Sequence, residues 1–175
     1  MIIGFEGGLG TGKTIGMVRY LKKDEAQGND LFINFGMKDT YYNKLNVTEI
    51  MENENLQNVS IGIDEITVFL DCRKSMSKMN RMLSYFILQT RKRNVNMYYT
   101  TQDFGMVDLR LIRHTSIQIF CENVYNDDND LIPNVKKYSM LDLRDKRNLS
   151  FTNFYLDISP YYKYYDTNEI ILPPI

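Results

Sequence analysis

The chain has 175 residues, with no tryptophan, one histidine and two cysteines. Nothing in the sequence pairs the histidine, His114, with a nucleophile, so we interpret it as a structural or surface residue rather than a catalytic base. Cys72 and Cys121 lack the spacing of a zinc site, and we interpret them as free thiols of a reducing compartment. These scarcities exclude a cysteine-based metal site and a His-based nucleophilic site.

Long apolar runs and a large net charge are also missing. No stretch approaches the roughly 18 consecutive apolar residues of a membrane-spanning helix, and no basic segment precedes the apolar start of the chain. We therefore expect no membrane insertion and a cytoplasmic location. Because the net charge is −1, any nucleic-acid partner would have to be bound by a local basic patch.

What the sequence does contain is an alternation of strand and helix patterns. At 43% hydrophobic residues, the chain has enough apolar material for one domain over 1–175. The alternation predicts an α/β fold, with a mainly parallel central sheet covered by helices on both faces over about 1–121. A β-hairpin extension is expected over about 122–175, and its acidic turn at 126–130 lacks the spacing of a calcium site. The expected strands are 1–5, 31–35, 59–65, 95–100 and 116–121, and the expected helices are 14–23, 48–54 and 75–93.

A complete phosphate-loop motif, G-x-x-x-x-G-K-[ST], lies between the first expected strand and the first expected helix. Its backbone N–H groups and the helix N-terminus would bind phosphates. Lys13 would reach the β- and γ-phosphates, and the hydroxyl of Thr14 would bind Mg²⁺. The motif predicts ATP and Mg²⁺ as cofactors, whereas a ligand-free glycine-rich turn is the alternative. The expected nucleotide-binding residues are Gly7, Gly8, Leu9, Gly10, Thr11, Gly12, Lys13 and Thr14.

Two carboxylates, Asp64 and Glu65, end the third expected strand. An acidic residue at the end of a buried strand next to the loop holds Mg²⁺ in phosphate-loop enzymes, and Asp64 has that position. Glu65 would polarise an attacking water, which a hydrolase needs and a kinase does not. Gln102, just beyond the next strand, would hydrogen-bond the γ-phosphate or that water. A carboxylate pair on an ordinary surface is the alternative.

The order of these motifs resembles that of the FtsK/HerA superfamily of DNA-pumping ATPases. Within it, the chain is most similar to the small genome-packaging ATPases of double-stranded DNA viruses, including archaeal ones, and to Zot-type ATPase domains. The resemblance covers about 1–121, with a looser match at 165–167. The segments that carry it, besides the phosphate loop, are 63–65, 89–93, 100–102 and 107–113.

The resemblance implies a RecA-like P-loop NTPase fold of the ASCE type and a homo-oligomeric ring, expected to be a hexamer. It also implies that a neighbouring subunit supplies an arginine for hydrolysis, for which Arg91 and Arg93 match and Arg110 and Arg113 are reserve candidates. A surface salt bridge is the alternative for each arginine. Expected partners are double-stranded DNA, bound without sequence specificity, and capsid vertex proteins. The location would be the host cytoplasm or the virion.

A basic stripe on the long helix expected at 75–93, and just before it, is the candidate DNA contact. In a ring, such a stripe could line the pore and follow phosphates without reading bases. An ordinary solvated helix face is the alternative. The candidate residues are Arg73, Lys74, Lys78 and Arg81. The C-terminal aromatic residues could stack on bases, but packing of the added strands or a subunit interface is the favoured use. These residues are Phe151, Phe154, Tyr155, Tyr161, Tyr162, Tyr164 and Tyr165.

The function that the sequence favours is an ATP-hydrolysing translocase of double-stranded DNA that packages a viral genome into a preformed capsid. A Zot-like assembly ATPase is one alternative, although Zot-type members usually carry a transmembrane segment beyond the ATPase domain. A small nucleoside or nucleotide kinase is a second, and Glu65 beside Asp64 and the lack of an arginine-rich lid argue against it. A non-enzymatic scaffold is a third, which an intact Lys13 and Thr14 argue against.

Overall fold

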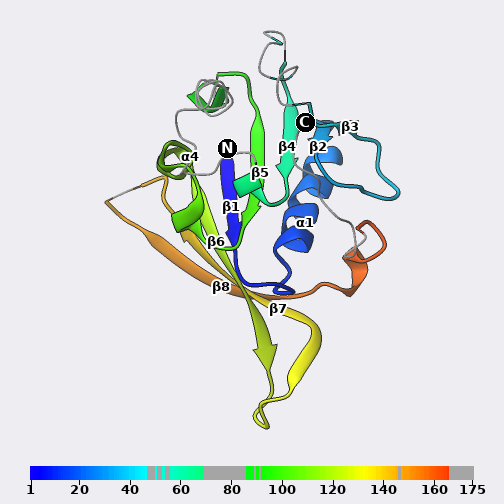
Figure 1. The fold of residues 1–175 in the computed structure, drawn as a ribbon, viewed down its shortest axis with the longest axis vertical. Helices are drawn as coiled ribbons and strands as arrows, with labels where there is room; N and C mark the ends of the chain where they lie inside the picture. The colour runs from blue at the N-terminus through cyan, green and yellow to red at the C-terminus, as the bar shows by residue number, and fades with distance from the viewer. Residues whose placement is uncertain are drawn as a thin grey trace.

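A computed structural model of the chain describes residues 1–46, 50, 53, 56–68, 86–88, 90, 92–145 and 147–165. Its centre is an eight-stranded sheet in the order β3-β2-β4-β5-β1-β6-β7-β8 (Figure 1). The strands are β1 (Ile2–Glu6), β2 (Asp30–Ile33), β3 (Asn43–Lys44), β4 (Val59–Ile63), β5 (Asn96–Thr101), β6 (Ile117–Tyr125), β7 (Leu131–Asp142) and β8 (Ser150–Asp157). The helices are α1 (Lys13–Glu25) and α4 (Leu109–His114), with 3₁₀ turns at Ile66–Val68, Phe104–Met106 and Ser159–Tyr161.

The strands from β3 to β6 in this order run parallel, which confirms the α/β class expected from the alternating pattern. Their carboxyl ends therefore meet at one edge of the sheet. Strands covered on both faces lack the apolar–polar alternation of a half-exposed sheet. β4, for example, is buried along its whole length, and its neighbour β5 is buried from Met97 to Thr101.

Two apolar clusters cover the two faces of the sheet, as expected. Ile3 and Phe5 of β1 pack with residues of α1, while Ile2 packs on the other face with Leu111 of α4 and with Phe86. Neighbouring residues of a strand point to opposite faces, so one apolar strand serves both clusters. Figure 1 shows α1 and α4 on opposite sides of β1.

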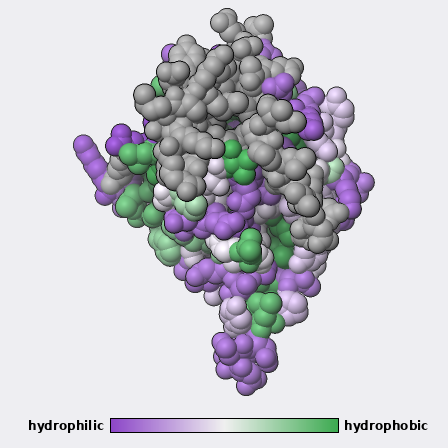
Figure 2. Space-filling view, in the orientation of Figure 1, coloured by the Kyte–Doolittle hydropathy of each residue, from purple (hydrophilic) through white to green (hydrophobic). Residues whose placement is uncertain are grey.

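The expected β-hairpin extension is present as β7 and β8, which continue the sheet in antiparallel pairing beside β6. The turn at 126–130 closes the β6–β7 hairpin: Asp130 N–H donates to Asn126 Oδ1 (2.7 Å), and Asn126 N–H donates to the Asp130 carbonyl (2.9 Å). Figure 2 shows hydrophilic side chains over this tip. Among the described residues, no group of three metal-ligating side chains is present. The acidic segment is exposed along its length and forms a hydrogen-bonded turn.

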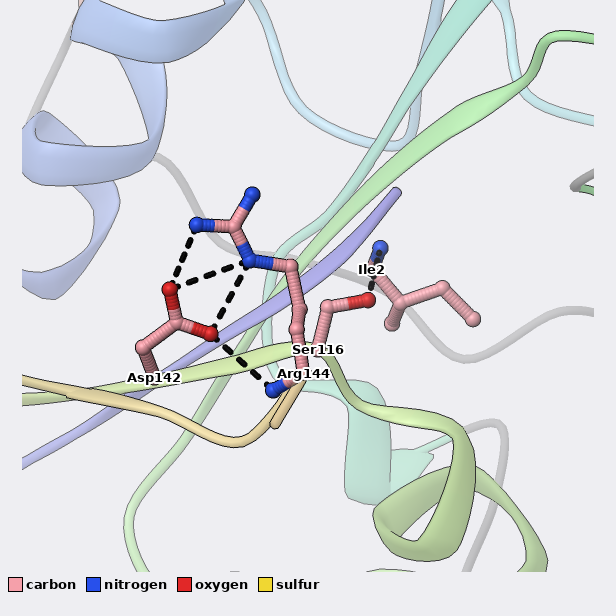
Figure 3. A network of polar contacts seen from close by, with 4 residues as sticks. All are labelled: Ile2, Ser116, Asp142 and Arg144. Atoms are coloured by element: carbon pink, nitrogen blue, oxygen red, sulfur yellow. Dashed lines mark hydrogen bonds and ion pairs between the residues drawn. The ribbon is translucent and has the colours of Figure 1, made fainter. Parts of the chain in front are cut away.

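Local polar contacts lie at the edge of the sheet where the parallel strands begin and the antiparallel β7 ends (Figure 3). Ile2 N–H donates to Ser116 Oγ at 3.4 Å, which links β1 to the start of β6. Arg144 Nε donates to Asp142 Oδ1 at 2.9 Å where β7 ends. Both contacts lie away from the carboxyl edge of the sheet and so belong to the framework.

Several expected features lie outside the described residues. Of the helix expected at 75–93, residues 86–88 and 90 are described and helical, and of the helix expected at 48–54 only residues 50 and 53 are described. No helix in the described parts of the chain is long and apolar enough to span a membrane. The candidate residues without a structural description are Cys72, Arg73, Lys74, Lys78, Arg81 and Arg91.

Candidate active site

The phosphate-loop motif connects β1 to α1 at the carboxyl edge of the sheet. Gly10 and Gly12 have φ values of 72° and 87°, a left-handed conformation that glycine adopts without steric cost. Gly12 immediately precedes α1, and Thr11 Oγ1 donates to the Gly8 carbonyl at 2.8 Å across the turn. The loop therefore curls in front of the N-terminus of α1, where unpaired N–H groups favour a phosphate.

Lys13 is the first residue of α1, and its side chain lies under the loop. The residue is only 6% exposed, and Nζ donates to the Gly8 carbonyl at 2.9 Å. An ammonium group held in this way is ready to exchange a carbonyl for a phosphate oxygen, because a charge-assisted hydrogen bond to an anion is the stronger of the two.

Thr14 and Asp64, the two expected metal ligands, are in contact. Thr14 Oγ1 donates to Asp64 Oδ1 at 2.9 Å, although the residues are 50 positions apart. Mg²⁺ binds through one or two protein oxygens together with water and substrate phosphates. The hydroxyl and the carboxylate, placed beside the phosphate loop, fit this ion.

Asp64 is almost fully buried, and burial raises the pKa of its carboxyl group above the ordinary value. Hydrogen bonds from Thr100 and Thr14 and the charge of Lys13 act in the opposite direction on this pKa. A bound divalent cation would favour the ionised carboxylate further.

Two residues to which no role in the site was assigned from the sequence contact Asp64, one at its carboxylate and one at its backbone. Thr100 Oγ1 donates to Asp64 Oδ1 at 2.5 Å. Asn34, just beyond β2, accepts from Asp64 N–H (2.8 Å) and donates to the Asp64 carbonyl (2.9 Å). The sequence signal was a small polar residue at the carboxyl end of each flanking strand, which is a weak one on its own.

Glu65 has a φ of 51°, an uncommon conformation for a non-glycine residue. Its N–H donates to Thr100 Oγ1 at 2.9 Å, so one hydroxyl contacts both consecutive acidic residues. Burial and the neighbouring charge of Asp64 raise the pKa of Glu65, whereas the charge of Lys13 and a side-chain hydrogen bond with Gln102 lower it. A carboxylate with a raised pKa is a stronger base, which suits proton acceptance from water.

The inserted position of β5 explains this arrangement. β5 lies between β1, which leads into the phosphate loop, and β4, which leads to Asp64. This additional strand separates the acidic strand from the strand that leads into the loop, as the ASCE type of P-loop fold implies. Thr100 and Gln102 at the end of β5 are thereby brought between the loop and the carboxylates, which gives Gln102 its contact with Glu65.

The phosphate loop, Asp64 and Glu65 border one cavity of about 700 Å³, whereas Gln102 is not part of its lining. Single residues of α1 and of the 3₁₀ turn after Glu65 also contribute. The remaining lining comes from β7 and the C-terminal segment, to which no site residue had been assigned from the sequence. The lining residues outside the phosphate loop are Ile15, Asp64, Glu65, Val68, Lys136, Ile158, Tyr162 and Tyr165.

Comparisons with known proteins agree on the architecture. The chain is similar to the N-terminal domain of zonular occludens toxin from Neisseria meningitidis, with a TM-score of 0.65, 18% identity, and coverage of 94% of this chain and 98% of that domain. It is also similar to the genome packaging NTPase B204 of Sulfolobus turreted icosahedral virus 2 in complex with ATP-gammaS, with a TM-score of 0.58, 9% identity, and coverage of 86% and 95%. No family model and no curated protein sequence matches the chain.

This chain has a RecA-like P-loop ATPase fold. A third similar structure is B204, the DNA-packaging ATPase from Sulfolobus turreted icosahedral virus, with a TM-score of 0.56, 11% identity, and coverage of 86% and 95%. At these identities the likeness establishes the fold, and what the site does has to be argued from its own residues.

In this P-loop fold, the described arginine candidates lie apart from the cavity. Arg93 precedes β5, and its Nη1 donates to the Asn53 carbonyl at 2.9 Å. Gln102 follows the other end of this six-residue strand, which spans about 20 Å. Arg110 forms an ion pair with Asp108 at 2.6 Å, and Arg113 is exposed on α4. None of these three described residues lines the cavity of its own chain.

Proposed function

We propose that the chain is an ATP-hydrolysing P-loop ATPase that translocates double-stranded DNA, in the packaging of a viral genome into a preformed capsid. The hydrolase assignment rests on one observation. Lys13, Thr14 in contact with Asp64, and Glu65 all border the same cavity. This constellation would supply a cation for the phosphates, oxygen ligands for Mg²⁺ and a base for water, which are the groups that one subunit contributes to hydrolysis.

The reaction can be written from these residues. Loop N–H groups and Lys13 would hold the β- and γ-phosphates, and Thr14 and Asp64 would hold Mg²⁺, whose charge would offset that of the phosphates. The Glu65 carboxylate accepts a proton from the water that attacks the γ-phosphorus. The bond from that phosphorus to the β–γ bridging oxygen breaks, which releases ADP and inorganic phosphate. Gln102 keeps Glu65 oriented toward the water through its side-chain hydrogen bond.

An arginine from a neighbouring subunit would complete the site, which requires a homo-oligomeric ring, proposed to be a hexamer. Support comes from the position of Arg93, at the opposite end of β5 from Gln102 and outside its own cavity. A cation supplied in trans offsets charge on the γ-phosphoryl group and is worth orders of magnitude in rate. Arg91, the other candidate, lies outside the described residues.

The DNA step rests on the order of sequence motifs and on two similar structures. Those structures are named as a genome packaging NTPase and a DNA-packaging ATPase. The proposed phosphate contacts are Arg73, Lys74, Lys78 and Arg81, which lie outside the described part of the chain. Capsid vertex proteins are the proposed partners that would bind the ring. Its proposed location is the host cytoplasm or the virion.

A Zot-type assembly ATPase is the second candidate. It is favoured by the likeness to the zonular occludens toxin domain, which extends over 94% of this chain and 98% of that domain. The two candidates share the hydrolytic site, so they differ in the partner that should stimulate turnover. DNA should stimulate the translocase, whereas the assembly ATPase should be indifferent to it.

The decisive experiment measures ATP turnover with and without double-stranded DNA. We expect turnover that rises with DNA, loss of turnover in Glu65→Gln with ATP binding retained, and weakened ATP binding in Lys13→Ala. Glu122→Gln, at an exposed carboxylate on β6, is the matched control and should behave as wild type. Normal hydrolysis by Glu65→Gln would overturn the assignment of the base. Turnover indifferent to DNA would favour the second candidate.

Mixed rings test the arginine in trans. A Glu65→Gln subunit lacks the base in its own site but still supplies its arginines to a neighbour. An Arg91→Ala or Arg93→Ala subunit keeps the base but lacks one arginine. Mixing the two should restore part of the hydrolysis, because one interface in the mixed ring then combines an intact base with an intact arginine. If no mixture recovers activity, hydrolysis does not depend on an arginine from the neighbour.

A further inference from the structure

Lys136 of β7 places a second ammonium group at the nucleotide cavity. It lies outside the parallel strands on which the phosphate-loop site is built, yet it lines the same cavity as Lys13 and Glu65. A Cβ atom added to Gly12 would lie 2.9 Å from Lys136 Cγ, so the aliphatic part of this lysine runs directly against the phosphate loop.

The position of this lysine is fixed by the strand pairing. Lys136 is paired with Asn123 of β6, and its Nζ donates to Asn123 Oδ1 at 2.5 Å. Two residues further along β7, Tyr138 OH donates to the Gly12 carbonyl at 2.9 Å. The loop and this part of β7 are therefore held together at two successive positions of the same face.

The ammonium group belongs to a buried residue and donates a hydrogen bond to a neutral partner. Lys136 is 7% exposed, its hydrogen-bond partner is a neutral amide, and no carboxylate of the described residues forms an ion pair with it. Burial lowers the pKa of Lys136 for this reason. A buried cation without a counterion is costly, and a bound anion would remove that cost.

The charges along the cavity point to the same anion. Among the described residues that line it, Lys13 and Lys136 are positively charged and Asp64 and Glu65 are negatively charged. Without Lys136, these described residues would carry a net negative charge, which disfavours a polyphosphate. Lys136 brings their summed charge to zero before any metal ion binds.

We propose that Lys136 is a second phosphate-binding lysine of this site, which contacts the phosphate chain of the bound nucleoside triphosphate in addition to Lys13. The inference rests on the proposed nucleotide-binding function and adds to it a residue supplied by the antiparallel extension. It gives that extension a role in the site, because β7 delivers a charged group that the parallel strands do not.

The adjacent residue provides a matched control. Lys137 follows Lys136 on β7 but points to the other face of the sheet, where its Nζ donates to Glu122 Oε2 at 2.8 Å. Replacing either lysine by methionine keeps a long apolar stem and removes one positive charge. Only Lys136→Met removes that charge from the cavity.

The experiment measures binding of Mg²⁺–ATP-gammaS and of inorganic tripolyphosphate by calorimetric titration. We expect Lys136→Met to weaken both ligands by about 10- to 100-fold, the usual effect of one hydrogen bond to a charged group. Lys137→Met should bind both within about twofold of wild type, and Lys136→Arg should recover part of the affinity. Tripolyphosphate has no base or ribose, so a lower affinity of Lys136→Met for tripolyphosphate identifies the phosphate chain as the contact.

The outcomes separate this inference from the proposed function. If Lys136→Met binds both ligands as wild type does, while Lys13→Ala loses them, the inference is overturned and the nucleotide site stands. If wild type binds neither ligand, both are overturned. Thermal unfolding without ligand excludes a structural explanation: Lys136→Met should melt no lower than wild type, because it removes a buried charge. A lower melting temperature with full affinity in the folded fraction would also overturn the inference.

Discussion

Two aspartates, each 5% exposed, lie at opposite edges of the sheet and in different surroundings. Asp24 lies near the end of α1, and its Oδ2 accepts hydrogen bonds from Ser60 Oγ (2.6 Å), Asn96 Nδ2 (2.8 Å) and Tyr98 OH (2.7 Å). Asp64 follows β4 at the carboxyl edge and borders the cavity together with Lys13.

The comparison shows that a buried carboxylate alone does not indicate a catalytic site. The partners of Asp24 are side chains of β4 and β5, so its hydrogen bonds tie α1 to the sheet. Asp64 accepts from Thr14, a residue with a proposed ligand-binding role, and it faces space that a nucleotide can fill. Asp64 differs from Asp24 in that it borders an open cavity together with a cation, Lys13.

The largest expected effect is on ATP turnover, when Asp64 at the carboxyl edge of the sheet is replaced. Asp64→Asn should lower ATP hydrolysis by about 1,000-fold, because the neutral amide is a poor ligand for Mg²⁺. Its free energy of unfolding should not fall, since burial disfavours the charge that the substitution removes. Steady-state turnover and urea denaturation measure the two quantities. Wild-type turnover by Asp64→Asn would contradict the metal assignment.

Replacement of Asp24, at the opposite edge, should lower stability and leave turnover unchanged. Asp24→Ala leaves two buried hydroxyl donors, on Ser60 and Tyr98, and the half-buried amide of Asn96 without their acceptor. The free energy of unfolding should therefore fall by about 3 kcal/mol. Turnover per folded molecule should stay unchanged. Asp30→Ala, at an exposed position of β2, is the control and should leave stability unchanged. A loss of turnover in folded Asp24→Ala would remove the distinction between the two aspartates.

Substitution of Thr100 tests whether its hydroxyl positions Asp64 and Glu65. Thr100→Val keeps the shape of the side chain and removes the hydroxyl that contacts Asp64 and Glu65. We expect turnover to fall by about 30-fold with little change in the KM for ATP, as a positioning role predicts. Thr100→Ser should restore activity. A rise in KM with unchanged kcat would show that Thr100 serves binding instead.

The smallest expected effect concerns the contact between β7 and the phosphate loop. Tyr138→Phe removes the hydrogen bond to the Gly12 carbonyl but keeps the ring stacked on Phe154. The free energy of unfolding should fall by about 1 kcal/mol, and nucleotide affinity should fall a few-fold. Tyr155→Phe, at an exposed position of β8, should change neither. Unchanged stability would show that the loop does not depend on this bond.

Much of the fold could be predicted from the sequence because its signals are local. The apolar run 1–5, the glycines of the loop and the Asp64–Glu65 pair each sit within a few residues of the structure that they specify. The contacts of Asp64 could not be predicted in this way, since Asn34 and Thr100 come from other strands. A small polar residue at a strand end is common, and only the strand order shows which ones meet.

The proposed phosphate-binding role of the loop can be read from the sequence alone, because one loop needs its glycines, Lys13 and Thr14 in a fixed local order. Which distant groups face that loop depends on the three-dimensional arrangement of the strands. Lys136 lies more than 100 residues away and carries no motif, yet the antiparallel pairing of β6 with β7 brings it against Gly12. Local backbone geometry can be read from neighbouring residues, whereas the surroundings of a cavity depend on how the strands are ordered.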